Sequence, residues 1–155
     1  MKRALLLLIP IALGVAVWGV NWKLDHPPQT NADKTFARLV GSADEVELST
    51  FSGTVKTSLH GTQLVQLREC LRFQDVSGLA TQGYDNYYTL IWKKNGKALV
   101  QLDTDLGKQP PCLWGSGDSP VNFNHNLNPR FGKRFEKTIN DFMPAPWQKR
   151  KQRKP

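Results

Sequence analysis

The order of hydrophobic and polar residues predicts short strands in the middle of the chain. Two stretches alternate between apolar and polar residues on either side of a Ser-Gly-Thr turn, residues 43–51 and 55–59. A second pair, residues 86–93 and 97–104, surrounds an Asn-Gly dipeptide, which tolerates the positive φ angles of a tight hairpin turn. Alternation of this kind is typical of half-buried strands. The pattern therefore predicts two β-hairpins, with a further edge strand at 110–114, where the prolines exclude a central position.

A helix is predicted to begin after Thr62, a residue type that can accept hydrogen bonds from the first turn. Leu64, Leu67 and Leu71 recur at helical spacing, and Gly78 ends the segment. Because the segment is short, a strand is the alternative prediction.

The clearest helix is predicted near the C-terminus, where Asn128 can cap the first turn and Pro129 suits its first position. Its apolar residues form one stripe, which we expect to pack on a sheet: Phe131, Phe135, Ile139 and Phe142. The predicted order is two strands, a helix, two or three strands and a helix. This order predicts an α+β domain, in which an antiparallel sheet of four to five strands carries two helices on one face.

The beginning of the chain is a segment of a different kind. Seventeen successive residues, 4–20, have no polar side chain. Continued to Trp22, this stretch would form a helix of about 28 Å, close to the hydrocarbon thickness of a bilayer. A signal peptide has a shorter apolar region and small residues at its cleavage site, whereas here only Gly19 offers a site, between bulky neighbours. We therefore predict a transmembrane signal-anchor over residues 1–22, with cleavage after Gly19 and a secreted protein as the alternative.

The residues that flank this segment predict the orientation of the chain. Lys2 and Arg3 precede it, and Lys23, Asp25 and His26 follow it. The positive-inside bias favours a cytoplasmic N-terminus. The expected localisation is the inner (plasma) membrane, with a single membrane span and a periplasmic or extracellular domain.

Composition divides the rest of the chain into three parts. Residues 23–36 are polar and contain two prolines, so they predict a linker. Residues 37–143 hold the predicted elements and form the expected extracytoplasmic domain. Residues 144–155 form a basic tail, which supplies much of the net charge of +8. Because the body of the chain is close to neutral, the composition argues against a nucleic-acid-binding domain.

The two cysteines are expected to form a disulfide. Cys70 and Cys112 lie 42 residues apart, and an even number of cysteines in a small exported domain is typical of a disulfide. Two unrelated buried thiols are the alternative. Neither the Arg-Glu-Cys stretch that ends at Cys70 nor the Pro-Pro-Cys-Leu-Trp stretch around Cys112 contains a histidine or aspartate to complete a ligand set, so no metal site and no cofactor are predicted.

A basic surface is the predicted contact site. Basic residues line the last helix beside its apolar stripe: Arg130, Lys133, Arg134 and Lys137. The tail continues this charge with Lys149, Arg150, Lys151, Arg153 and Lys154. Such a surface is attracted to an anionic membrane, cell-wall polymer or acidic envelope protein. A tail that only increases solubility is the alternative.

Candidate catalytic residues are few. Asp103 and Asp105 lie two apart at the end of a predicted strand, and His125 lies in an asparagine-rich segment. Together they could serve an envelope hydrolase or transferase. No known catalytic motif includes them.

The asparagines of this segment are a second candidate for binding, because they occupy every second position: Asn122, Asn124, Asn126 and Asn128. If the segment is extended, their amides lie on one side and can bind sugar or peptide backbone, whereas local turn formation is the alternative. We therefore expect a non-catalytic binding module, accessory, inhibitory or assembly in role, for an envelope partner.

Overall fold

The computed structural model describes residues 27–50, 52–77, 87–107, 110–115 and 122–144. These residues form three helices and seven strands, which in chain order are α2 (Asn31–Val40), β1 (Glu45–Thr50), β2 (Lys56–His60), α3 (Gly61–Glu69), β3 (Phe73–Ser77), β4 (Tyr87–Lys94), β5 (Lys97–Asp105), β6 (Cys112–Gly115), β7 (Asn124–Leu127) and α4 (Pro129–Phe142). None of the helices in these ranges is long and apolar enough to cross a membrane. The predicted signal-anchor and the basic tail lie outside the described residues.

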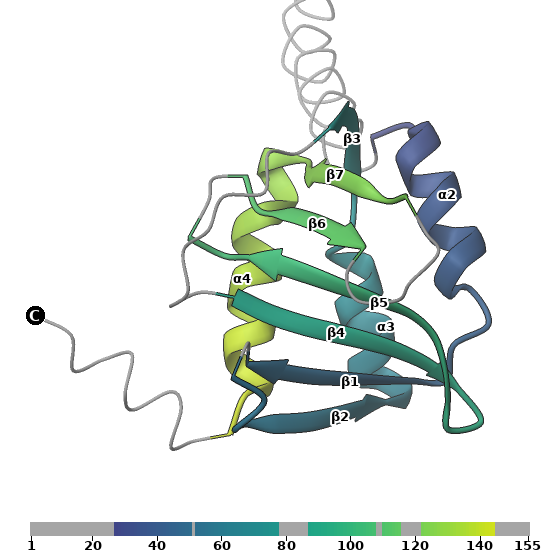
Figure 1. Ribbon diagram of the computed structural model, residues 1–155. Coiled ribbons are helices and arrows are strands. Elements are labelled where there is room, and N and C mark those ends of the chain that lie inside the picture. The colour runs from purple at the N-terminus through teal and green to yellow at the C-terminus, as the bar shows by residue number, and fades with distance from the viewer. Residues whose placement is uncertain (1–26, 51, 78–86, 108–109, 116–121, 145–155) are drawn as a thin grey trace, which may run out of the picture.

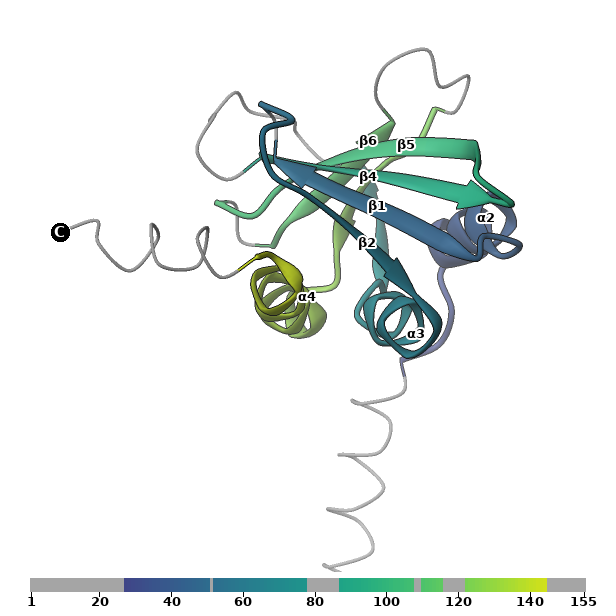
Figure 2. The ribbon, with the colours of Figure 1, turned by 90° about the horizontal axis from the view of Figure 1, so that it is seen from below.

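The seven strands form one antiparallel sheet in the order β2-β1-β4-β5-β6-β7-β3 (Figure 1). The three helices lie on the same side of this sheet, as the view from below shows (Figure 2). The α+β class and the antiparallel sheet are thus confirmed. The sheet is larger than predicted, with seven strands instead of four or five, and three helices cover it instead of two.

The hydrophobic core lies between the sheet and the helices. The strands contribute alternate side chains, all nearly inaccessible to solvent: Val46, Leu48, Leu59, Tyr88, Leu90, Trp92, Val100, Leu102 and Leu113. From the helices, Phe36, Leu67, Phe135 and Ile139 pack against them. Both predicted hairpins are present, and Asn95 and Gly96 have the positive φ angles of 49° and 76° that their turn requires.

Helix α2 occupies part of the segment that we expected to be a linker. Thr30 caps it through a capping box: the Thr30 hydroxyl accepts from the Asp33 amide, and the Asp33 carboxylate accepts from the Thr30 amide. Phe36 then enters the core at ring-centroid distances of 5.0 Å from Phe73 and 5.4 Å from Trp92. The linker prediction is therefore wrong from Asn31 onward, because the polar residues here cap and cover a packed helix.

Hydrogen bonds connect strand β3, at the sheet edge, with the beginning of α2. The Asp75 carboxylate accepts from the backbone amides of Ala32 (2.8 Å) and Asn31 (3.1 Å), and these amides lower the pKa of Asp75. From the other direction, the Phe73 amide donates to Asp33 at 2.8 Å, and the Thr30 hydroxyl donates to the Phe73 carbonyl at 3.1 Å. Helix and strand therefore satisfy each other's exposed backbone groups.

Strand β6 is central in the sheet, between β5 and β7, and not at an edge as the prolines suggested. The reason is that Pro110 and Pro111 precede its first residue, Cys112, and so remove no hydrogen bond from the ladder. Pro111 instead packs against α4. A Cβ at Gly132 would lie 2.7 Å from the Pro111 ring, so this position of the helix has room only for glycine.

The expected disulfide is absent, because Cys70 and Cys112 are buried thiols that are not bonded to each other. Cys70 ends α3 on the helix side of the sheet, where its sulfur lies 3.2 Å from the Gln66 carbonyl and 3.4 Å from the Thr138 hydroxyl. Cys112 points to the other side and lies 3.2 Å from the Asn124 side-chain oxygen. The sheet separates the two thiols, and the cysteines therefore lend no support to an oxidising compartment.

Candidate functional site

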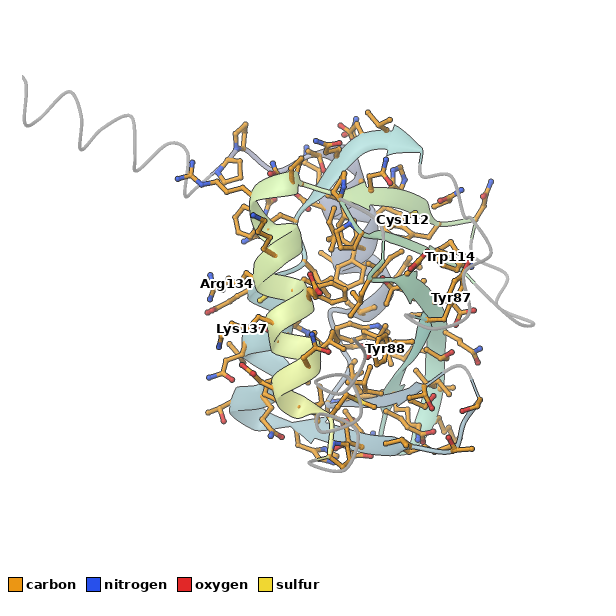
Figure 3. The ribbon with its side chains drawn as sticks, turned by 90° about the vertical axis from the view of Figure 1, so that its left-hand side faces the viewer. Tyr87, Tyr88, Cys112, Trp114, Arg134 and Lys137 are labelled. Carbon is orange, nitrogen blue, oxygen red and sulfur yellow. The ribbon has the colours of Figure 1, made fainter. Side chains whose placement is uncertain are left out.

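The predicted basic residues of α4 lie on its solvent side, as Figure 3 shows for Arg134 and Lys137. All four of these side chains, from Arg130 to Lys137, are exposed. Arg134 forms an ion pair with Glu69 at 3.2 Å, and Lys137 forms one with Asp141 at 2.8 Å, which raises the pKa of Lys137. Exposed pairs of this kind add little stability, but they reduce the positive charge available to a partner. The structure therefore brings the predicted residues together on a surface that is less basic than the sequence suggested.

The candidate catalytic residues lie on opposite sides of the sheet. Asp103 pairs with Trp114 and Asp105 pairs with Cys112, and these residues all point away from the helices. His125 pairs with Leu113 of the core side, its ring lies 4.9 Å from the Phe123 ring, and its Nδ1 is buried without a hydrogen-bond partner among the described residues. Because a sheet separates the histidine from the two carboxylates, they do not form a catalytic site together.

The side of the sheet that α2, α3 and α4 leave uncovered carries an aromatic pair. The rings of Tyr87 (β4) and Trp114 (β6) lie 5.3 Å apart at an interplanar angle of 74°, a favourable edge-to-face arrangement. Both side chains are only partly buried. In Figure 3 the labels place Tyr87 and Trp114 on this side, whereas Tyr88, the next residue along β4, points toward the helices. The alternation of β4 thus puts one tyrosine in the core and the other, partly exposed, on the opposite face of the sheet.

Polar side chains surround the two rings. Thr89 donates from its hydroxyl to the Asp103 carboxylate at 2.8 Å, and so fixes that carboxylate beside Trp114. Asn124 and Asn126 extend the surface across β7, and both are partly exposed. We call this group the aromatic surface, and it consists of Tyr87, Thr89, Asp103, Trp114, Asn124 and Asn126.

The asparagine pattern was the sequence signal for this surface. The segment is extended over Asn124–Leu127, so two of the four asparagines in the pattern face the same side, as expected for a strand. Tyr87 and Trp114 were not singled out from the sequence. The alternation in β4 predicted that Tyr87 and Thr89 share a face, but no local pattern could show that β6 brings Trp114 next to that face.

On the same side of the sheet, near β1 and β2, two lysines and two glutamates balance one another's charge. Lys93 donates to Glu47 at 2.7 Å and lies 3.8 Å from Glu45, while Lys56 donates to Glu47 at 3.1 Å. The hydrogen bond from Lys93 is the main cause that lowers the pKa of Glu47, and the same bond raises the pKa of Lys93. These charges satisfy one another, whereas the aromatic surface presents partly exposed rings and amides.

The donor sets for metals are incomplete within the described ranges, where no group of three or more His, Cys, Asp or Glu side chains is arranged to hold an ion. Comparisons of the chain with protein-family models, with curated proteins and with solved structures found no match.

Proposed function

We propose that this chain is a non-catalytic binding module, held at a membrane by residues 1–22, which recognises an uncharged carbohydrate through the aromatic surface. The observation that carries the proposal is the pair of partly exposed rings, Tyr87 and Trp114, on a sheet face that the described helices leave open. A membrane location outside the cytoplasm rests on residues 1–22 and their flanks alone. It would place such a module beside the polysaccharides of a cell envelope.

The chemistry of the aromatic surface favours a sugar over an anionic partner. Aromatic rings offer flat apolar faces for the C–H groups of a sugar ring, and a small number of polar groups then fixes its orientation. Asn124 and Asn126 provide amide donors and acceptors, and Asp103 provides a carboxylate acceptor, all of which suit hydroxyl groups. No member of the aromatic surface is cationic, so it offers no charge to phosphate or sulfate.

Replacement of Trp114 by alanine is expected to weaken carbohydrate binding by about tenfold or more, because aromatic side chains dominate the energy of such contacts. The measurement is titration calorimetry of the full chain in detergent with soluble oligosaccharides of glucose and of N-acetylglucosamine. Asp103→Asn is expected to weaken binding less, since one acceptor oxygen remains.

A matched control removes two charges from the surface that the sequence favoured. Arg130→Gln with Lys133→Gln should leave oligosaccharide binding unchanged, and circular dichroism should show that every variant is folded. If the double variant lost oligosaccharide binding while Trp114→Ala still bound the oligosaccharides, the binding site would lie on α4 and not on the aromatic surface. Binding of a sulfated polysaccharide in preference to the neutral ones would have the same meaning.

The anchor is tested separately by the intact mass of the native protein after membrane fractionation. We expect the mass of all 155 residues in the membrane fraction, because the apolar stretch is long enough to span a bilayer. A mass that lacks about nineteen N-terminal residues, found in the soluble fraction, would show a cleaved signal peptide and a secreted protein. Either result leaves the aromatic surface unchanged, so the two tests are independent.

A further inference from the structure

A groove of about 150 Å³ is lined by residues of α2 and of the segment at the end of α3. These two helices lie on the opposite side of the sheet from the aromatic surface (Figure 2). Its walls are apolar along α2, where Phe36, Ala37 and Val40 line it, and Leu71 closes the side of α3. A cavity of this volume in another protein accommodates benzene, which sets the ligand size at about six non-hydrogen atoms.

Two guanidinium groups line the same groove, Arg68 and Arg72. Arg68 is held in place, because its Nη2 donates to the carbonyls of Val40 (2.7 Å) and Ala43 (2.8 Å) and the group lies 5.7 Å from the centroid of the Trp92 ring. Its Nε is buried without an acceptor among the described residues. Burial lowers the pKa of Arg68, so this cation has lost hydration that a nearby anion would replace.

The charge of the groove is not balanced by its own residues. Asp33 is the single acidic residue in the lining, and its carboxylate is used by the backbone amides of Thr30 and Phe73. Within the described ranges, neither arginine forms an ion pair with Asp33 or with another carboxylate. Two cations and one anion leave one positive charge beside an apolar wall.

We infer that this groove binds a small monocarboxylate, with the carboxylate at Arg72 and Arg68 and a short apolar group against Phe36, Ala37 and Val40. The planar guanidinium matches the two oxygens of a carboxylate. One negative charge balances the groove, whereas a doubly charged phosphate would add an excess charge next to Asp33. The apolar wall gives an aliphatic acid of about four carbons an advantage over a purely polar anion.

The test is calorimetric titration of the full chain, in a neutral maltoside detergent, with butanoate, with butanamide and with inorganic phosphate. We expect saturable binding of butanoate, and at least tenfold weaker binding of the neutral amide and of phosphate. Arg72→Gln should weaken butanoate at least tenfold. Arg72 is the better residue to change, because loss of Arg68 would also leave the carbonyls of Val40 and Ala43 without a donor.

The matched control is Arg38→Gln, which removes an exposed guanidinium from α2 that does not line the groove. This variant should bind butanoate like the unchanged chain. Ala37→Leu places extra carbon in the groove from an exposed position, and should weaken butanoate without loss of the folded state. Equal binding of butanoate and butanamide, or equal effects of the Arg38 and Arg72 variants, would overturn the inference. Neither result depends on carbohydrate binding at the aromatic surface.

Discussion

Replacement of Phe36 by alanine is expected to lower the free energy of unfolding by about 3–5 kcal/mol, the usual range for a buried phenylalanine. Phe36 is 5 % exposed, and it contacts three other aromatic rings: Phe73, Trp92 and Phe123. The variant would lose the transfer free energy of the ring and leave a cavity among rigid groups that cannot collapse well. Urea titration followed by tryptophan fluorescence measures the change through the transition midpoint.

The control is the same substitution at Phe142, which lies at the end of α4 and is only partly buried. We expect its effect to be less than half as large, because less apolar surface is removed from the core. Equal effects at the two positions would show that α2 packs less firmly on the sheet than its ring contacts indicate.

Replacement of Asp33 by alanine is expected to cost about 2–4 kcal/mol, because two backbone donors lose their acceptor at once. The Phe73 amide, which donates to Asp33 at 2.8 Å, lies in the buried region, and the Thr30 amide belongs to the capping box. The loss should also be visible locally. Amide hydrogen exchange at Phe73 should become faster in the variant, since the donor is no longer protected by the carboxylate.

Asp141→Ala is the matched control for this second prediction. Asp141 is also a helical aspartate, but it is exposed and contacts Lys137 in a surface ion pair. We expect a much smaller change in the free energy of unfolding, because exposed ion pairs add little stability. An effect as small as this in Asp33→Ala would mean that water replaces the carboxylate at the Phe73 amide.

The sequence predicted the parts of this fold that depend on local patterns. Alternation placed β4 and β5, and the spacing of Phe131, Phe135 and Ile139 placed α4, because burial on one face of an element determines these patterns. Helix α2 was missed although its signals are local. Thr30 and Asp33 form a capping box, and Ala32, Phe36 and Val40 follow at helical spacing, but two nearby prolines suggested a linker.

Features that depend on pairing between distant segments of the chain could not be predicted from the sequence. Strands β3 and β7 are only five and four residues long, and each is recognised as a strand because of its partner. The aromatic surface also depends on long-range pairing. Tyr87 and Trp114 come close to each other because their strands, β4 and β6, both pair with β5. The groove likewise forms because Arg72 lies beside α2, a helix that precedes it by about thirty residues. No local spacing of residues predicts this contact.

The position of β3 in the sheet has a consequence for the order in which the chain folds. Its partner is β7, and Phe73 pairs with Leu127, so this contact closes a long loop of chain. By contrast, β4 pairs with β5 across a two-residue turn, and a short loop forms faster than a long one. We therefore expect the central hairpin to form first and the edge made of β3 and α2 to assemble late. A refolding intermediate would then have protected amides in β4 and β5 while those of β3 still exchange with solvent.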